Sequence, residues 1–72
     1  MSTKKELDFS VFLLYILAEK WKKPPYKVYQ ILNSTGVLDE YIIKCYDVLH
    51  TLGADYLAED ITEFVLEKGV EL

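Results

Sequence analysis

Cys45 and His50 are the two side chains whose types could form a nucleophile and its base. The chain has one cysteine and one histidine in 72 residues, and they stand five positions apart. On a helix of 3.6 residues per turn, that spacing directs the side chains about 140° apart. Nucleophilic catalysis needs the pair within hydrogen-bond reach and a third group to orient the base. We therefore expect no catalytic residues. Cys45 is predicted to be a small core residue, and His50 to cap a helix end or to bond Asp47 or Tyr46.

Metal and cofactor sites are not expected either. A single cysteine can form neither an internal disulfide nor a thiolate cluster for zinc. The three glycines stand at predicted helix ends and make no phosphate-binding loop. No segment carries acids at the alternating positions of a calcium loop. The sequence therefore predicts no metal and no cofactor, and a fold without disulfides suits a reducing cytosol.

A row of acids spaced four residues apart is the most unusual feature of the chain. On a helix this spacing makes successive members neighbours, and like charges so placed repel each other. Three interpretations stay open: a solvated face, contact with the lysines of segment 20–27 within the chain or across a dimer, or binding to a basic partner protein. The members of this row are Asp55, Glu59, Glu63, Glu67 and Glu71.

Six tyrosines are more than a domain of this size can bury completely. Tyrosine is favoured at protein interfaces because its ring is apolar and its tip is polar. Partial exposure around the edge of the core is the simpler interpretation for each of them. Together with four of the acids, three tyrosines form the candidate partner-binding set. This set comprises Asp55, Glu59, Glu63, Glu67, Tyr41, Tyr46 and Tyr56.

The elements that position these residues are predicted to be helices. Apolar residues recur at helical spacing, two glycines and Pro24-Pro25 separate the segments, and no stretch shows the alternation of a strand. We expect an all-α fold, a small bundle of about four helices within one domain, 1–72. The predicted helices span residues 4–22, 25–34, 38–52 and 54–68, and the last is either continuous or broken near Asp60.

The first predicted helix is apolar around nearly its whole circumference. One apolar stripe has 4-3-4-3 spacing, and most of the remaining circumference is filled by Phe9, Phe12, Leu13, Ile16 and Leu17. Such a helix lies either at the centre of a bundle or against another chain, so a homodimer joined through this helix is an alternative to a dedicated partner. The predicted stripe consists of Leu7, Val11, Leu14, Ala18 and Trp21.

The two later helices also have predicted inner faces. In segment 38–52 the apolar positions follow i, i+3, i+4, i+7 spacing and include Val48 and Leu52, with Gly53 as the stop signal. In segment 54–68, Asp60 could cap a second helix, with Glu63 three residues later as the reciprocal carboxylate.

Charge argues against nucleic acid as a partner. Residues 1–36 carry six lysines and three acids, residues 37–72 carry two lysines and nine acids, and the chain has no arginine. Arginine is the main reader of guanine and phosphate. Segment 25–52 has the outline of a helix-turn-helix, but its second helix opens with Leu38-Asp39-Glu40, and acids there would repel the duplex. A DNA-binding regulator is therefore the weaker alternative.

A membrane or secretory role is not expected. The apolar run 9–18 is shorter than the roughly 20 residues of a membrane span. A signal peptide would carry no acids before this run, whereas Glu6 and Asp8 stand there. The predicted location is cytoplasmic.

The chain resembles the short bacterial family called domain of unknown function 3791. The resemblance is carried by segments 5–9, 36–42 and 55–64, and most specifically by Tyr46-Asp47-Val48-Leu49-His50-Thr51-Leu52-Gly53. Glu40, before Tyr41-Ile42, is an extra residue relative to the family pattern. The family has no assigned activity, but its members are often encoded beside proteins similar to ADP-ribosyltransferases. The resemblance therefore implies an antitoxin-like or accessory role, and we expect a small, non-enzymatic protein-interaction module.

Overall fold

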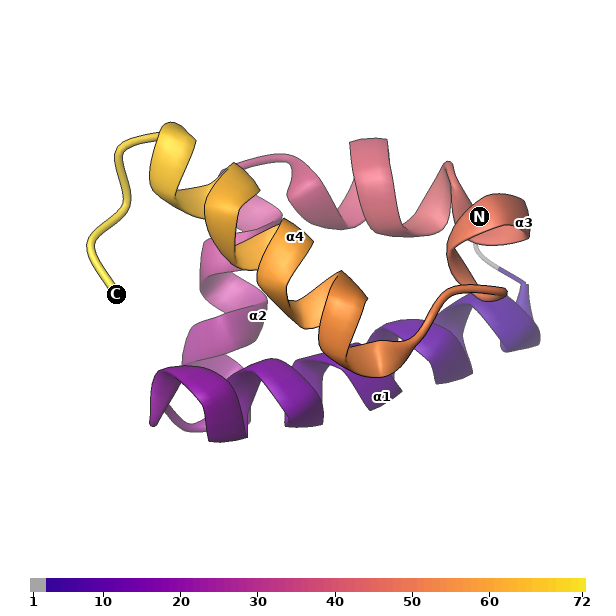
Figure 1. Cartoon of the computed structure of the whole chain (residues 1–72), viewed down its shortest axis with the longest axis horizontal. Helices are drawn as coiled ribbons and strands as arrows, with labels where there is room; N and C mark the ends of the chain where they lie inside the picture. Colours follow the sequence, from indigo (N-terminus) through magenta and orange to yellow (C-terminus); the bar gives the residue numbers. More distant parts are fainter. Residues whose placement is uncertain (1–2) are drawn as a thin grey trace.

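A computed structural model describes residues 3–72 as five helical segments with no strand among them (Figure 1). The all-α small bundle is thus confirmed; the predicted domain, 1–72, extends two residues beyond the described ones. None of the described helices is long and apolar enough to cross a membrane. The segments are α1 (Lys4–Trp21), α2 (Pro25–Ser34), η1 (Leu38–Ile43), α3 (Tyr46–Leu49) and α4 (Ala54–Glu67).

The start of α1 is fixed by a capping box. Thr3 Oγ1 accepts a hydrogen bond from the Glu6 backbone N–H at 3.2 Å, and a Glu6 carboxylate oxygen accepts one from the Thr3 N–H at 3.0 Å. Two N–H groups that the helix itself cannot pair are satisfied in this way. The helix ends at Trp21, where Lys22 adopts a left-handed conformation with φ of 57° ahead of Pro24.

The apolar stripe of α1 is only partly buried. The buried side is formed by Ser10, Leu13, Leu17 and Trp21, whereas Leu7 is 57% exposed. Because α1 is apolar all round, its own periodicity could not select the buried side. That side is selected by α2, η1 and α4, which all pack against α1.

The second helix has its predicted bounds, but Tyr29, which was predicted to lie on its inner face, is exposed. Pro25 occupies the first turn of α2, where its missing N–H costs nothing, and Val28 and Leu32 point into the core. After Ser34 the chain turns through Gly36, whose φ of 80° suits glycine. Val37, directly after this turn, is also buried.

The predicted helix 38–52 is interrupted. Segment η1 is a π-helix, and Cys45 then leaves helical geometry with φ of −101° and ψ of 18° before α3 begins. A π-helix holds more residues per turn than an α-helix.

Local hydrogen bonds end α3 earlier than the apolar pattern predicted. The side chains of His50 and Thr51 bond to the carbonyls of Tyr46 and Val48, at 2.7 Å each. The same two carbonyls also accept backbone N–H bonds, from His50 at 3.0 Å and from Thr51 at 3.2 Å, so the last turn of α3 is closed locally. As a result Val48 is 65% exposed and Leu52 is exposed, contrary to the prediction, and only Leu49 of α3 is buried. Gly53 serves as the extended N-cap of α4 instead of stopping the preceding helix.

The last helix is continuous through Asp60. The Asp60 carboxylate accepts a hydrogen bond from the Tyr41 hydroxyl, and therefore points sideways to η1 instead of capping a new helix. The Thr62 hydroxyl donates to the Ala58 carbonyl at 2.6 Å, one turn back along the same helix. The predicted alternative of a break near Asp60 is thus resolved in favour of one helix.

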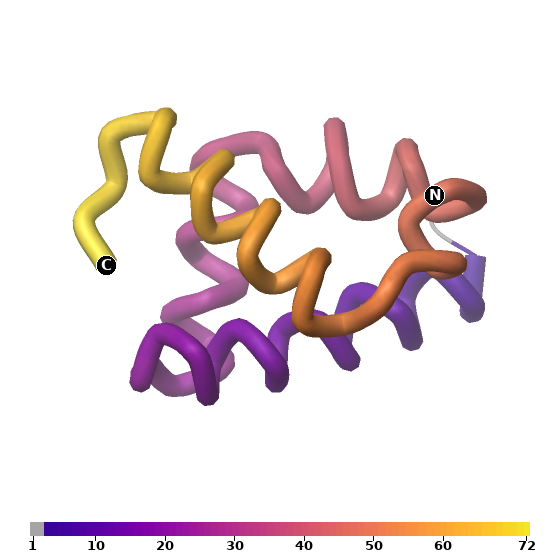
Figure 2. Tube along the Cα trace, in the orientation of Figure 1, coloured from indigo at the N-terminus to yellow at the C-terminus, as the bar shows by residue number. Residues whose placement is uncertain are grey.

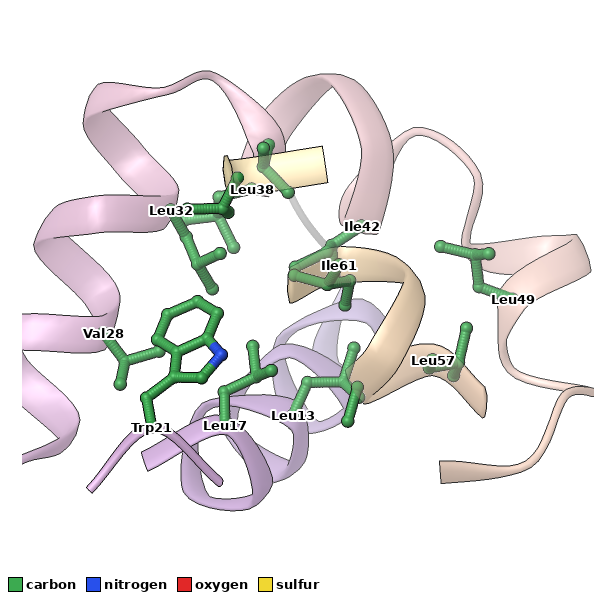
Figure 3. Close-up of a cluster of buried hydrophobic side chains, with 13 residues drawn as sticks. Leu13, Leu17, Trp21, Val28, Leu32, Leu38, Ile42, Leu49, Leu57 and Ile61 are labelled. Atoms are coloured by element: carbon green, nitrogen blue, oxygen red, sulfur yellow. The ribbon is translucent and has the colours of Figure 1, made fainter. Parts of the chain in front are cut away.

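The core forms where α4 crosses α1. Figure 3 shows Trp21 beside Leu17, with Val28 and Leu32 of α2 close to its ring. The Trp21 indole Nε1 donates to Thr62 Oγ1 at 2.8 Å, which joins the end of α1 to the middle of α4. The trace in Figure 2 places α3 beside the first turns of α1, where the rings of Phe9 and Tyr46 meet edge to face with centroids 5.4 Å apart.

Replacing Thr62 with valine should lower the free energy of unfolding by about 1–2 kcal/mol, because the Trp21 N–H would be left buried without a partner. Urea unfolding followed by fluorescence measures this directly, since Trp21 is the single tryptophan. Thr62→Ser keeps the hydroxyl and should retain most of the stability. Equal stability of the valine variant and the wild type would show that the hydrogen bond contributes nothing.

Candidate partner-binding surface

The acid row lies on one exposed face of α4. Because the helix is unbroken, Asp55, Glu59, Glu63 and Glu67 follow one another at one-turn intervals, and all four are exposed. Glu71 lies beyond the helix, which ends at Glu67 and is followed by Gly69 with φ of 91°. The row on the helix therefore has four members instead of five. We call these four residues the acid row.

The acid row is not neutralised within the described part of the chain. The ion pair found there joins Lys4 to Asp8 at 2.9 Å, and no lysine comes within 4 Å of a row carboxylate. Of the lysines in segment 20–27, Lys20 borders the same surface hollow as Asp55 and Glu59. The predicted contact with the lysines of segment 20–27 is thus not made as an ion pair within residues 3–72.

Apolar side chains stand within the same face. At 100° per residue, Tyr56 and Leu66 fall inside the arc that runs from Asp55 to Glu67, opposite the buried side of α4. Tyr56 is 61% exposed and Leu66 is 49% exposed. Tyr56 was in the predicted set, whereas Leu66 was missed. The 3.6-residue helical period already places Leu66 among the acids, so this spacing was the sequence signal that could have added Leu66 to the predicted set.

The acid row borders a hollow between α4 and α1. Ile16 and Ala58 contribute apolar surface to it, and Glu19 adds a carboxylate from α1 to those of Asp55 and Glu59. The hollow has a volume of about 470 Å³. Its combination of aliphatic surface and carboxylates suits a lysine or arginine side chain, whose stem is apolar and whose tip is cationic.

Tyr41 lies on the flank of α4 and is held there by two contacts. Its hydroxyl donates to Asp60, and its ring packs on Phe64 with centroids 5.5 Å apart. Burial, and then the hydrogen bond to Asp60, raise the pKa of the Tyr41 hydroxyl well above its ordinary value of 10. Tyr41 therefore stays a neutral donor, half-buried beside the acid row instead of within it.

Tyr46 is the member of the predicted set that lies away from α4. It belongs to α3, where its ring meets Phe9 and stacks on His50 with centroids 4.6 Å apart. His50 is exposed, and its Nδ1 donates to the Tyr46 carbonyl. A bond to Tyr46 was one of the predicted alternatives for His50.

Cys45 is half-buried against the core. The described residues contain no group of histidine, cysteine and carboxylate side chains that could hold a metal ion.

The helix-turn-helix outline is altered by η1. The segment that would serve as the recognition helix is a six-residue π-helix, and its first turn exposes Asp39 and Glu40. These carboxylates would face DNA phosphates at the point where such a helix enters the groove.

Tyr41→Phe should lower the free energy of unfolding at pH 7 by about 1 kcal/mol, because Asp60 loses its donor. Since the folded-state pKa is raised, the hydroxyl stabilises the fold fully below pH 10 and progressively less above it, as the unfolded chain releases the proton first. The difference between wild type and variant in urea unfolding should therefore shrink between pH 7 and about pH 11. Tyr15→Phe, at an exposed tyrosine, is the control and should show no such change; a Tyr41→Phe difference that stays constant with pH contradicts the argument.

Comparison with known proteins places the chain in a family. The family described as "Protein of unknown function (DUF3791)" matches residues 8–68, which include all of α2, η1, α3 and α4 and most of α1. Comparisons with curated proteins and with solved structures gave no match. The match covers far more than half of the 72 residues, so the chain belongs to the DUF3791 family.

Proposed function

We propose that this chain is a small protein-interaction module that binds a basic surface of a partner protein through the exposed face of α4. The observation that carries the proposal is the acid row with Tyr56 and Leu66 set inside it. The row has no ion-pair partner among the described residues, and the two apolar side chains are exposed beside it. A solvated face kept only for solubility would gain nothing from an exposed tyrosine at one end of the acid row and an exposed leucine at the other.

Each part of this face would contribute differently to binding. Carboxylates attract a basic partner over a distance and set the orientation of approach, which raises the association rate. Tyr56 and Leu66 would be desolvated on contact. Buried aromatic and aliphatic groups slow dissociation, and so determine most of the lifetime of a complex. The hollow beside Asp55 and Glu59 would receive one basic side chain of the partner.

The proposed partner is a protein, and the resemblance described above names the first one to test. We propose that the module acts as an antitoxin-like or accessory subunit of an ADP-ribosyltransferase-like protein encoded beside it, in the cytoplasm. A specific complex of standard size would cover about 800 Å² of this protein. Its total accessible surface is 4871 Å². One face of the molecule would therefore provide enough surface for such a complex.

Charge reversal on the acid row should weaken the complex. Pull-down from lysate of the source with tagged wild type should retain a stoichiometric basic protein, and the double variant Glu59→Lys/Glu63→Lys should lose it. Glu40→Lys/Asp47→Lys is the matched control, because it makes the same charge change at exposed acids outside α4. Equal retention by the acid-row variant and the control would remove the acid row from the proposal.

Salt and truncation should separate the two contributions once the partner is purified. Raising ionic strength from 0.05 to about 0.5 M should slow association of the wild type, because screening shortens the reach of exposed charges. Tyr56→Ala/Leu66→Ala should leave the association rate nearly unchanged and speed dissociation at least about tenfold. Surface plasmon resonance reports both rates, and an unchanged dissociation rate would exclude the apolar pair from the interface.

A further inference from the structure

A hollow lined by lysines lies at the corner where α1 ends and α2 begins. Lys22 and Lys23 belong to the connection between the two helices, and Lys27 belongs to the first turn of α2. All three line one hollow of about 620 Å³, which we call the lysine hollow. Its other wall is the segment after α4, which Figure 1 shows returning towards this corner. No member of the acid row lines it.

The charges of the lysine hollow are not neutralised within residues 3–72. No carboxylate comes within 4 Å of its three ammonium groups, although Glu71 borders the same hollow. Three lysines and one glutamate leave a local balance of +2. Lys23 is also half-buried, so less of its conformational freedom remains to be lost when an anion binds.

Helix electrostatics explains only part of this cluster. Positive charge near the C-terminal end of α1 interacts favourably with the helix dipole, which accounts for Lys22 and Lys23. Lys27 stands in the first turn of α2, where the same effect is unfavourable, and that turn contains no acid to offset it. Lys27 is therefore placed against the preference of its own helix, and an anionic group in the hollow would offset that cost.

The lining of the hollow favours an acidic peptide over a simple anion. Beside the ammonium groups lie the aliphatic surfaces of Pro24, Ile31 and Val70. An inorganic anion would use the charges alone, whereas a peptide with an aliphatic residue next to a carboxylate would use both parts of the lining. The chain itself places such a pair there, since Val70 packs against the core and the neighbouring Glu71 borders the lysines.

The resident pair leaves the site open to another segment. Because Glu71 makes no ion pair with the three lysines, an incoming carboxylate would not have to displace one. A nucleic-acid backbone fits this site less well than a peptide. It presents phosphates without aliphatic side chains, and it would approach a chain that has a net charge of −4 and no arginine.

We propose that the lysine hollow is a second docking site, which binds an acidic peptide segment that carries an aliphatic residue next to a carboxylate. The carboxylates of the segment would contact Lys22, Lys23 and Lys27, and its aliphatic side chain would contact Ile31 and Val70. The acid row and the lysine hollow would then bind regions of opposite charge, on one partner or on two. This inference goes beyond the function proposed above, because it uses no residue of the acid row.

Fluorescence polarisation with labelled synthetic peptides and the purified full chain tests the site. The acidic probe repeats leucine–glutamate–glutamate four times, and the neutral probe has glutamine in place of every glutamate. The wild type should bind the acidic probe at concentrations up to about 1 mM and should not bind the neutral one. Lys23→Gln/Lys27→Gln should weaken binding about fivefold, because two ion pairs are lost. Lys5→Gln/Lys44→Gln is the matched control, since it removes two exposed lysines outside the hollow, and it should bind like the wild type.

A third probe separates a peptide site from a simple anion site. Serine in place of leucine keeps every carboxylate and removes the aliphatic side chains, so it should weaken binding at least about threefold. Equal binding of the serine and leucine probes would make the hollow a simple anion site and would overturn the proposal. Absence of binding at 1 mM overturns it too, as does equal binding by the lysine variant and its control. Circular dichroism checks that each variant remains helical.

The two proposals can fail separately. Lys23→Gln/Lys27→Gln should still retain the basic protein in the pull-down described above, because the acid row is unchanged. Light scattering tests whether a second copy occupies the hollow instead. The wild type should remain a monomer of 8.4 kDa in this measurement. Self-association that Lys23→Gln/Lys27→Gln abolishes would assign the hollow to the acid row of another copy and would overturn the proposal of a separate segment.

Discussion

The hydrogen bond from Trp21 to Thr62 and the burial of Leu57, Ile61 and Val65 together determine how α4 lies on α1, and the surfaces of the molecule follow from that contact. An indole N–H buried in an apolar core must find an acceptor, and the Thr62 hydroxyl provides it at 2.8 Å. The hydroxyl in turn donates to Ala58, so its acceptor lone pair is directed at α1. This fixes the rotation of α4 about its own axis. The side with Leu57, Ile61 and Val65 faces inward, and the acid row faces solvent.

A shortage of residues is the second constraint. The chain has 72 residues, and α1 alone supplies Leu13, Leu17 and Trp21 to the core against three other helical segments. Such a helix needs apolar residues on more than one side. The apolar surface of α1 is therefore larger than the area that α2, η1 and α4 cover, and Leu7 and Val11 remain uncovered beside a groove.

The sequence predicted an all-helical chain and most of the helix ends, because these depend on local signals. Pro24-Pro25, Gly36 and the 3.6-residue period act within a few residues of the boundary they determine. The inner side of α1 and the interruption at Cys45 depend on contacts between distant segments, such as Phe9 with Tyr46 and Tyr41 with Asp60. For the candidate surface, the spacing placed Asp55, Tyr56, Glu59, Glu63 and Glu67 together correctly. It could not show that Tyr46 packs on α1.

The unbroken course of α4 through Asp60 has a consequence for the kind of target that the acid row would fit. Asp55 and Glu67 are twelve residues apart on one helix, so at 1.5 Å per residue the row extends over about 18 Å. The helix holds the four carboxylates at this spacing before any contact, so binding would cost little conformational entropy in the backbone of the row. A basic segment whose charges repeat along a similar length would match the row, whereas the same charges gathered at one point would meet only part of it.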